Sequence, residues 1–257
     1  MSNIQTHPPS TRRRAALALC AVVAALALAA ALSACGGAEQ PTARGCVVVD
    51  VSGSARPEIT TTYLPGFTRF VQRIAREGSG DICFAFAASG LSGGASSWAS
   101  FACPDPDDTL RCEPLVRQSV AAAAQQLVAV ASAPAIPLRG ASELVECLAL
   151  IAPATAPGDE ILVLSDAIEN SRLMGNFADH EVDLDTSSID ELLAGLRQRN
   201  LLPDLRGRRL LIPYALTHGS RPLRMSATRQ QGIRVFWERY ATAAGARLTF
   251  GGGTAAI

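Results

Sequence analysis

From residue 46 onward, short apolar runs rich in β-branched residues alternate with longer stretches whose apolar residues recur at helical spacing. Strands that are apolar on both faces are typical of parallel sheets covered by helices on either side. The alternation therefore predicts an α/β fold with a doubly wound, mostly parallel sheet and helices on both faces. We expect strands at 46–51, 81–88, 160–165, 208–216 and 247–250, with a short edge strand around 98–102.

Two aromatic stripes predict helices between these strands. Each stripe places four large apolar residues at i, i+3, i+4 and i+7, so that they share one helical face. The stripes are Phe67, Phe70, Val71 and Ile74, and then Ile233, Phe236, Trp237 and Tyr240. At this spacing we expect core packing rather than a binding surface. Further helices are expected at 113–131, 142–152 and 188–199, the last with Ser187 or Ser188 as its cap.

Composition narrows the class of protein. The chain has 257 residues, of which 48% are hydrophobic and 18% charged, so it can bury a sizeable core and does not have a disordered composition. Its 23 basic residues balance its 23 acidic residues. A nucleic-acid partner would require a clustered basic face to offset phosphate charge, and we expect no such partner.

The N-terminal segment has the pattern of an export signal. Arg12, Arg13 and Arg14 precede an apolar run from Ala15 to Ala34. The run ends in Leu-Ser-Ala-Cys at 32–35, which resembles the bacterial lipobox, and this resemblance implies that Cys35 receives a lipid and becomes the mature N-terminus. A plain transmembrane anchor is the alternative, because about 20 apolar residues also span a bilayer.

Both alternatives place the rest of the chain outside the cytoplasm. We expect a signal peptide at 1–35, a flexible tether at 36–44 and one domain at 45–257. The expected location is the bacterial cell envelope, with the domain anchored to a membrane by lipid and facing the periplasm or the cell exterior.

Five cysteines remain after Cys20 in the signal and Cys35 are set aside, and disulfides persist in such a compartment. Cys103 and Cys112 flank a turn-rich stretch, and we expect them to form a disulfide. Their spacing does not suit zinc. Cys46, Cys83 and Cys147 lie in apolar patterns and are expected to pack as small hydrophobic residues.

Oxygen-bearing side chains follow two of the expected strands and precede one helix. The first strand opens into Asp50-Val-Ser52-Gly-Ser54, a D-x-S-x-S segment. Ser142 stands before a helix in Gly-Ala-Ser-Glu-Leu, and Asp166 ends the next buried strand. In a doubly wound sheet, loops at the carboxyl ends of strands meet where the strand order reverses. We therefore expect a functional site at this edge of the sheet.

In this order and context, the three segments resemble the metal-ion-dependent adhesion site of von Willebrand factor type A domains. The resemblance implies a divalent cation, Mg²⁺ or else Mn²⁺ or Ca²⁺, at Asp50, Ser52, Ser54, Ser142 and Asp166. It also implies that the serines touch the metal directly or nearly so, while the aspartates act partly through water. Ala167 departs from the pattern, which usually has glycine after the aspartate.

An all-oxygen ligand set suits a hard cation such as magnesium. The family's function then implies docking of a protein partner that offers an acidic residue. None of the site residues is a nucleophile with its own base, so we do not expect an enzyme. A metal-free structural envelope lipoprotein is one alternative. Another is a serine hydrolase with Ser92, Asp166 and His218, because Ser92 lies in a G-x-S-x-G match, although no helical pattern begins directly behind it.

Overall fold

The computed structural model describes residues 43–52, 57–76, 80–87, 97–101, 142–179, 182–218 and 221–257, together with Ala55 and scattered residues between 114 and 129. Within this part, one main sheet has six strands. Their spatial order is β10 (Arg247–Phe250), β7 (Arg209–Ile212), β4 (Thr155–Leu164), β1 (Ala43–Asp50), β2 (Gly80–Ala87) and β3 (Ser97–Phe101). All neighbouring strands pair in parallel except β2 and β3, which are antiparallel.

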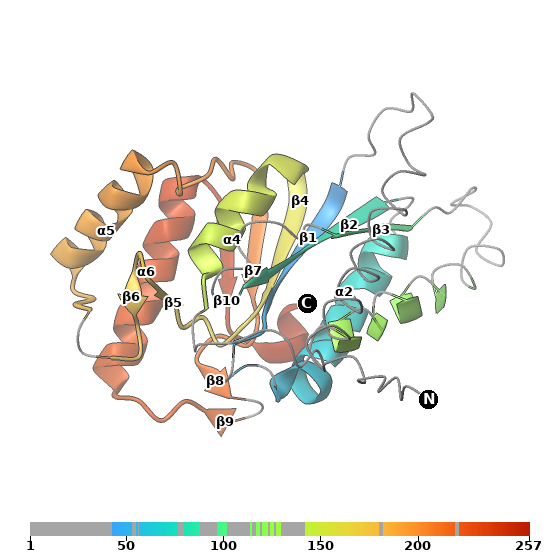
Figure 1. The fold of residues 1–257 in the computed structure, drawn as a ribbon, viewed down its shortest axis with the longest axis horizontal. Coiled ribbons are helices and arrows are strands. Elements are labelled where there is room, and N and C mark those ends of the chain that lie inside the picture. Colours follow the sequence, from blue (N-terminus) through green and yellow to red (C-terminus); the bar gives the residue numbers. More distant parts are fainter. Residues whose placement is uncertain are drawn as a thin grey trace, which may run out of the picture. The chain divides into compact units, whose positions relative to one another are not determined.

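Helices cover both faces of this sheet (Figure 1). On one face lies α2 (Leu64–Arg76), and on the other lie α4 (Leu144–Ile151), α5 (Thr186–Gln198) and α6 (Ala227–Ala244). Successive residues of β1 alternate between the two cores: Val47 and Val49 pack on the α2 side, whereas Cys46 and Val48 pack on the α4 side. The predicted doubly wound, mostly parallel α/β fold is confirmed.

Both aromatic stripes lie in the core, as predicted. Every residue of the two stripes is at most 2% exposed. Burial of each such side chain stabilises the fold by roughly 1.5–3 kcal/mol. A π-helical turn, η1 (Ile59–Tyr63), leads into α2. The short elements are η2 (Ala152–Ala154), β5 (Asn170–Ser171), β6 (Gly175–Asn176), β8 (Thr217–His218), β9 (Arg221–Pro222) and η3 (Gly253–Ala256).

Several boundaries differ from the prediction. β4 begins at Thr155 although Pro157 and Gly158 suggest a turn, because the pairing with β1 jumps from Thr155 to Glu160 and leaves the turn residues in a bulge. The prediction of a strand up to residue 216 is wrong. β7 ends at Ile212, because Pro213 has no N–H to donate to a sheet.

The predicted cap of α5 is also wrong. Asp185 caps this helix, with its carboxylate accepting a hydrogen bond from the backbone N–H of Ser188 at 2.8 Å. The hydroxyl of Ser187 donates to the same carboxylate, also at 2.8 Å. The helix therefore begins at Thr186, directly after the cap Asp185, and both serines lie inside its first turn.

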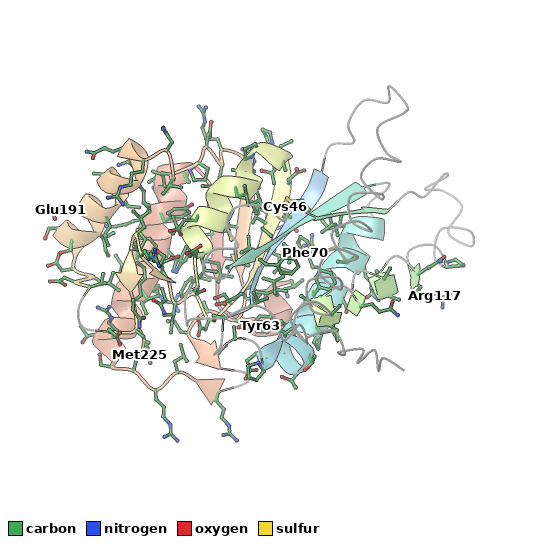
Figure 2. All side chains as sticks on the ribbon, in the orientation of Figure 1. Cys46, Tyr63, Phe70, Arg117, Glu191 and Met225 are labelled. Atoms are coloured by element: carbon green, nitrogen blue, oxygen red, sulfur yellow. A yellow bond between two sulfur atoms is a disulfide. The ribbon has the colours of Figure 1, made fainter. Side chains whose placement is uncertain are left out.

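The cysteines correct a further prediction. Cys46 and Cys83 form a disulfide between β1 and β2, where the two residues are direct partners with their Cα atoms 4.5 Å apart. Figure 2 labels Cys46 on β1. The sequence pattern placed each residue in the core but did not reveal the strand register that joins them. Cys147 is buried with a free thiol, as expected of a small apolar residue. Cys103 and Cys112 lie outside the described residues.

Among the residues that the structure describes, no helix is both long enough and apolar enough to cross a membrane. The apolar run at 15–34 lies outside that part of the chain, as does the expected tether up to residue 42.

Candidate metal site at the carboxyl edge of the sheet

The strand order reverses between β1 and β4. The chain builds β2 and β3 on one side of β1, and then β4, β7 and β10 on the other side. Asp50 is the last residue of β1, and Asp166 follows β4 by two residues. Open α/β sheets bind ligands in the crevice at this reversal, outside the carboxyl ends of the strands. The topology therefore brings two of the predicted site residues to the place where a ligand is expected.

Asp50 is the centre of a buried hydrogen-bond cluster. Its carboxylate is 1% exposed and accepts hydrogen bonds from Ser52, Ser142 and Ser165. Oδ1 accepts from the backbone N–H of Ser52 at 2.9 Å, while Oδ2 accepts from Ser142 Oγ at 2.7 Å and from Ser165 Oγ at 2.8 Å. The first and second predicted segments thus meet directly, although Asp50 and Ser142 are 92 residues apart in sequence.

The loop after β4 fixes the position of Ser142. Asn170 and Ser142 exchange two backbone hydrogen bonds, of 2.8 and 3.0 Å. Glu169 is fully buried, and its Oε2 accepts from the N–H groups of Leu144 and Val145 at 3.0 and 3.1 Å, which caps the start of α4. The same loop therefore holds both the hydroxyl of Ser142 and the helix that begins behind it.

Asp166 lies at the start of that loop and is 7% exposed. Its Oδ1 accepts from the backbone N–H of Ile168 at 3.0 Å, and its carbonyl accepts from the N–H of Leu216 at 2.7 Å. The next residue, Ala167, has a φ of 67°. This left-handed conformation costs a residue with a Cβ about 1–2 kcal/mol. The hydrogen bond from Trp237 Nε1 to the Ala167 carbonyl, at 2.9 Å, helps to hold it.

The two carboxylates carry charge that no described side chain neutralises. Burial raises the pKa of Asp50, and the hydrogen bonds from Ser52, Ser142 and Ser165 lower it only in part. Burial, together with the charge of Asp50, raises the pKa of Asp166 to about 7. Within the described part of the chain, neither aspartate forms an ion pair with an arginine. Buried charge of this kind is stable when a proton or a cation compensates it.

The oxygen atoms available as ligands at this site fit a hard divalent cation. The Ser142 hydroxyl has one proton, which it gives to Asp50, so its lone pairs stay available to a metal. Ser165 Oγ donates to Asp50 and accepts from the N–H of Ala167 at 3.1 Å, and so it positions Asp50. Within the described ranges, no three His, Cys, Asp or Glu side chains form a metal-binding group. A cation here would therefore depend on serine hydroxyls as well as carboxylates.

Three residues near the site are not evident from the sequence patterns. Ser165 reads as the end of an apolar strand, and Glu169 caps a helix that begins 25 residues earlier. Tyr63 is 2% exposed, with its ring centroid 5.4 Å from that of Tyr214. Burial raises the pKa of Tyr63, and the negative charges of Asp166 and Asp50 raise it further. Figure 2 labels Tyr63 near the ends of the strands.

The structure does not describe all of the predicted site residues. Ser54 and Ser92 lie outside the described residues, and so does the side chain of His218, whose backbone belongs to β8. The five-residue metal set is therefore described at Asp50, Ser52, Ser142 and Asp166. The hydrolase alternative is described only at Asp166, which hydrogen-bonds its own loop.

Comparison of the sequence with protein-family models and with curated proteins finds no match. Because a fold of this class serves many functions, function has to be argued from the site itself.

Proposed function

We propose that this chain is an exported, lipid-anchored protein whose domain resembles von Willebrand factor type A domains and binds a protein partner through a divalent cation. The observation that carries the proposal is the 2.7 Å hydrogen bond from Ser142 Oγ to the buried carboxylate of Asp50 at the reversal of the strand order. It holds a neutral oxygen ligand next to the paired negative charges of Asp50 and Asp166.

Each site residue has a defined part in this proposal. Asp50 orients Ser142 and Ser52, and Asp166 adds the second negative charge. When bound at such oxygens, Mg²⁺, Mn²⁺ or Ca²⁺ supplies positive charge and an open coordination position for a partner's carboxylate. The chain offers neutral hydroxyls rather than further carboxylates, which leaves more positive charge for the partner.

The surface beside the site favours an acidic partner. The N–H of Leu216 donates to the carbonyl of Asp166, and the N–H of Leu223 donates to the carbonyl of Leu216 at 3.0 Å. The β8–β9 segment is thereby tied to the site. It presents Arg221 and, just beyond β9, Arg224, both of them exposed and without an acidic partner among the described residues. Such charges speed the approach of an acidic surface.

The disulfide between Cys46 and Cys83 supports the export part of the proposal, because structural disulfides persist mainly outside the cytoplasm. Lipid attachment at Cys35 is tested by growing cells with a labelled fatty acid. We expect label in the parent chain and none in Cys35→Ala. Equal labelling of the two chains would refute the lipid anchor.

Calorimetric titration of the purified full chain with MgCl₂ or MnCl₂ tests the metal site. We expect binding by the parent, and none by Asp50→Asn or by Asp166→Asn, which keep the shape of the side chains. Asp204→Asn is the matched control, because it removes an exposed carboxylate at the other end of the sheet. The metal proposal fails if the parent binds no cation, or if both aspartate variants bind as the parent does.

The docking function needs its own test. A labelled peptide rich in aspartate is titrated onto the full chain with Mg²⁺ and then with a chelator. Binding should require the cation and should weaken several-fold in Arg221→Glu with Arg224→Glu. Equal affinity with Mg²⁺ and with chelator would show that the cation takes no part in docking.

A further inference from the structure

The opposite edge of the sheet, where the strands begin, forms a second surface. Ala43 at the start of β1 pairs with Thr155 at the start of β4, and Arg209 of β7 pairs with Arg247 of β10. The N–H of Arg247 also donates to the carbonyl of Arg208 at 3.0 Å. We call this surface the amino edge. It lies one strand length from the candidate metal site, about 26 Å for the eight residues of β1.

The amino edge is basic. Its described arginines are Arg73, Arg199, Arg206, Arg208, Arg209 and Arg247, and its described carboxylates are Asp159, Glu160 and Asp204. Glu160 is buried and is shared by Arg73 and Arg209, while Asp204 pairs with Arg206. Arg199 and Arg247 are exposed and have no acidic partner in the described ranges. Among the side chains that the structure describes at this edge, arginines therefore outnumber carboxylates.

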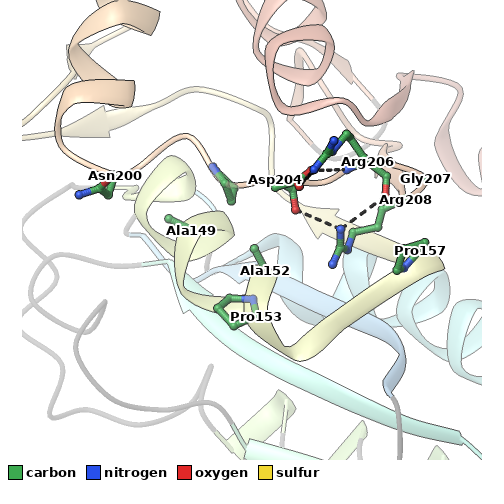
Figure 3. Close-up of a pocket in the computed structure, with 10 residues that line it drawn as sticks. Ala149, Ala152, Pro153, Pro157, Asn200, Asp204, Arg206, Gly207 and Arg208 are labelled. Carbon is green, nitrogen blue, oxygen red and sulfur yellow. Dashed lines mark hydrogen bonds and ion pairs between the residues drawn. The ribbon is translucent and has the colours of Figure 1, made fainter.

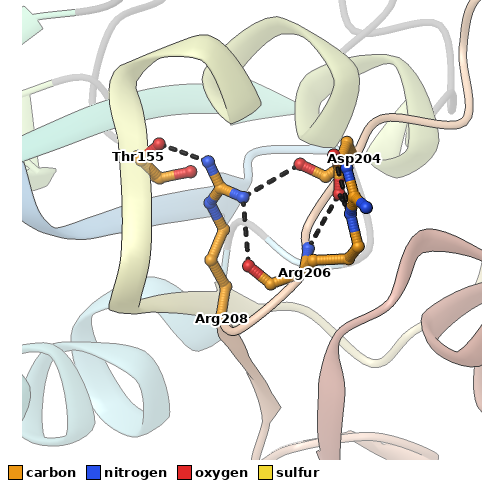
Figure 4. Close-up of polar contacts among 4 residues, drawn as sticks. All are labelled: Thr155, Asp204, Arg206 and Arg208. Atoms are coloured by element: carbon orange, nitrogen blue, oxygen red, sulfur yellow. Dashed lines mark hydrogen bonds and ion pairs between the residues drawn. The ribbon is translucent and has the colours of Figure 1, made fainter.

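A hollow of about 860 Å³ opens on this edge (Figure 3). Arg208 lies on its wall and donates to the carbonyls of Thr155 and Asp204, while its Nε is buried without a partner in the described structure (Figure 4). The rest of the lining is mostly apolar, with Ala149, Ala152, Pro153, Pro157 and Pro203.

Leu150 provides an exposed apolar side chain in the same turn of α4 as Ala149. It is 41% exposed and is the one exposed large hydrophobic side chain among the described residues. It follows Ala149, which lines the hollow, in the last turn of α4. Arginines around a partly apolar surface are the combination that binds at the interface of a lipid bilayer, where guanidinium groups meet phosphates and apolar side chains enter between headgroups.

We propose that the amino edge rests on the anionic phospholipid surface of the membrane that anchors the chain. Cys35 precedes Ala43 by eight residues, so a fully extended segment separates them by at most about 29 Å. A transmembrane segment that ends at residue 34 lies nine residues before Ala43 and gives a similar limit, about 32 Å. The inference rests on the anchoring part of the proposed function and is independent of the metal. It turns the candidate metal site away from the membrane, toward a partner.

Arginine labelling of the anchored full chain tests this orientation. The chain is reconstituted in vesicles of phosphatidylcholine alone or with phosphatidylglycerol, recovered by flotation and treated with an arginine-specific dicarbonyl reagent. Mass spectrometry then gives the modified fraction at each arginine. We expect modification of Arg199 and Arg247 to fall at least about threefold with phosphatidylglycerol, because lipid phosphates cover them. Modification of Arg221 and Arg224 should stay unchanged.

Charge reversal provides the matched comparison. With Arg199→Glu and Arg247→Glu together, we expect Arg206 to be modified equally in both kinds of vesicle. With Arg221→Glu and Arg224→Glu, the amino edge should stay protected. A chain that fails to float refutes the anchor and this inference with it. A floating chain with equal modification at both edges, or with Arg221 and Arg224 protected instead, overturns the orientation alone and leaves the metal proposal to the calorimetric test.

Discussion

Replacing Asp166 by Asn should stabilise the cation-free protein at neutral and alkaline pH. Burial and the charge of Asp50 raise the pKa of Asp166 from 3.8 to about 7, so the folded chain holds this proton more tightly than the unfolded chain does. As the pH rises from 4 to 7, the unfolded chain releases the proton first, and folding loses about 1.36 kcal/mol for each pH unit in between. Above pH 7 the loss is complete, at about 4 kcal/mol.

The neutral amide of Asp166→Asn does not carry this cost, and its carbonyl can still accept from the N–H of Ile168, now 3.0 Å from Oδ1. In chelator we therefore expect the variant to be more stable than the parent by up to about 4 kcal/mol at pH 8 and by about half as much at pH 5. Urea unfolding followed by tryptophan fluorescence measures both values. The Asp204→Asn control removes an exposed carboxylate and should change stability by less than about 1 kcal/mol.

Mg²⁺ at 100 times its dissociation constant should reduce the advantage of the variant at pH 8 from about 4 to about 1 kcal/mol. A cation bound to the folded parent at 100 times its dissociation constant adds about 2.7 kcal/mol, and the variant should gain almost none of it. The reasoning is refuted if Asp166→Asn is less stable than the parent in chelator at pH 8, or if its advantage is the same at pH 5 and pH 8.

Substitutions at three other places test the surrounding structure. Cys46→Ala with Cys83→Ala opens a disulfide between residues 37 apart and should cost about 4 kcal/mol, and a chain equally stable with and without reductant would contradict it. Ala167→Gly relieves the left-handed backbone conformation but loses a buried methyl group, so the free energy of unfolding should change by less than about 1 kcal/mol. Ala167→Val should lower it by more than about 2 kcal/mol, because a β-branched residue strains this conformation further. Equal melting temperatures of the two variants would count against the backbone argument. Arg229→Met removes the hydrogen bonds to the carbonyls of Phe177, Asp179 and Val182 and should speed amide hydrogen exchange at these residues. Unchanged exchange would show that Arg229 does not stabilise this segment.

The fold class follows from the sequence because its signals are local and repeated. Val47, Val48 and Val49 are apolar on successive positions, which only a strand buried on both faces requires, and the structure gives all three 0% exposure. The stripe from Phe67 to Ile74 has a helical period, and it lies in the core. The meeting of Asp50 with Ser142 was also expected, because the resemblance to the type A adhesion site implies that both belong to one ligand set.

Features that depend on register or on distant partners are not predictable in this way. Cys46 and Cys83 become partners only when β1 and β2 pair at one particular register. Glu169 caps α4 from the loop after a later strand, so no local spacing marks it as a cap. The bulge that lets Pro157 lie within β4 likewise depends on where β1 runs alongside it. In each case the deciding contact joins segments that are far apart in sequence.

The direction of the helices connects the two proposed surfaces. In a parallel α/β sheet, helices run opposite to the strands, so their positive N-terminal ends lie at the carboxyl edge and their negative C-terminal ends at the amino edge. Asp50, Asp166 and the cap Glu169 lie at the first edge, where helix dipoles favour negative charge. Arg197 and Arg199 lie at the C-terminal end of α5, where the dipole favours positive charge. Each edge thus has side chains whose charge is the one that the helix ends at that edge favour. If Cys35 carries the proposed anchor, the short segment before Ala43 and the arginines of the amino edge would together orient the domain on an anionic membrane.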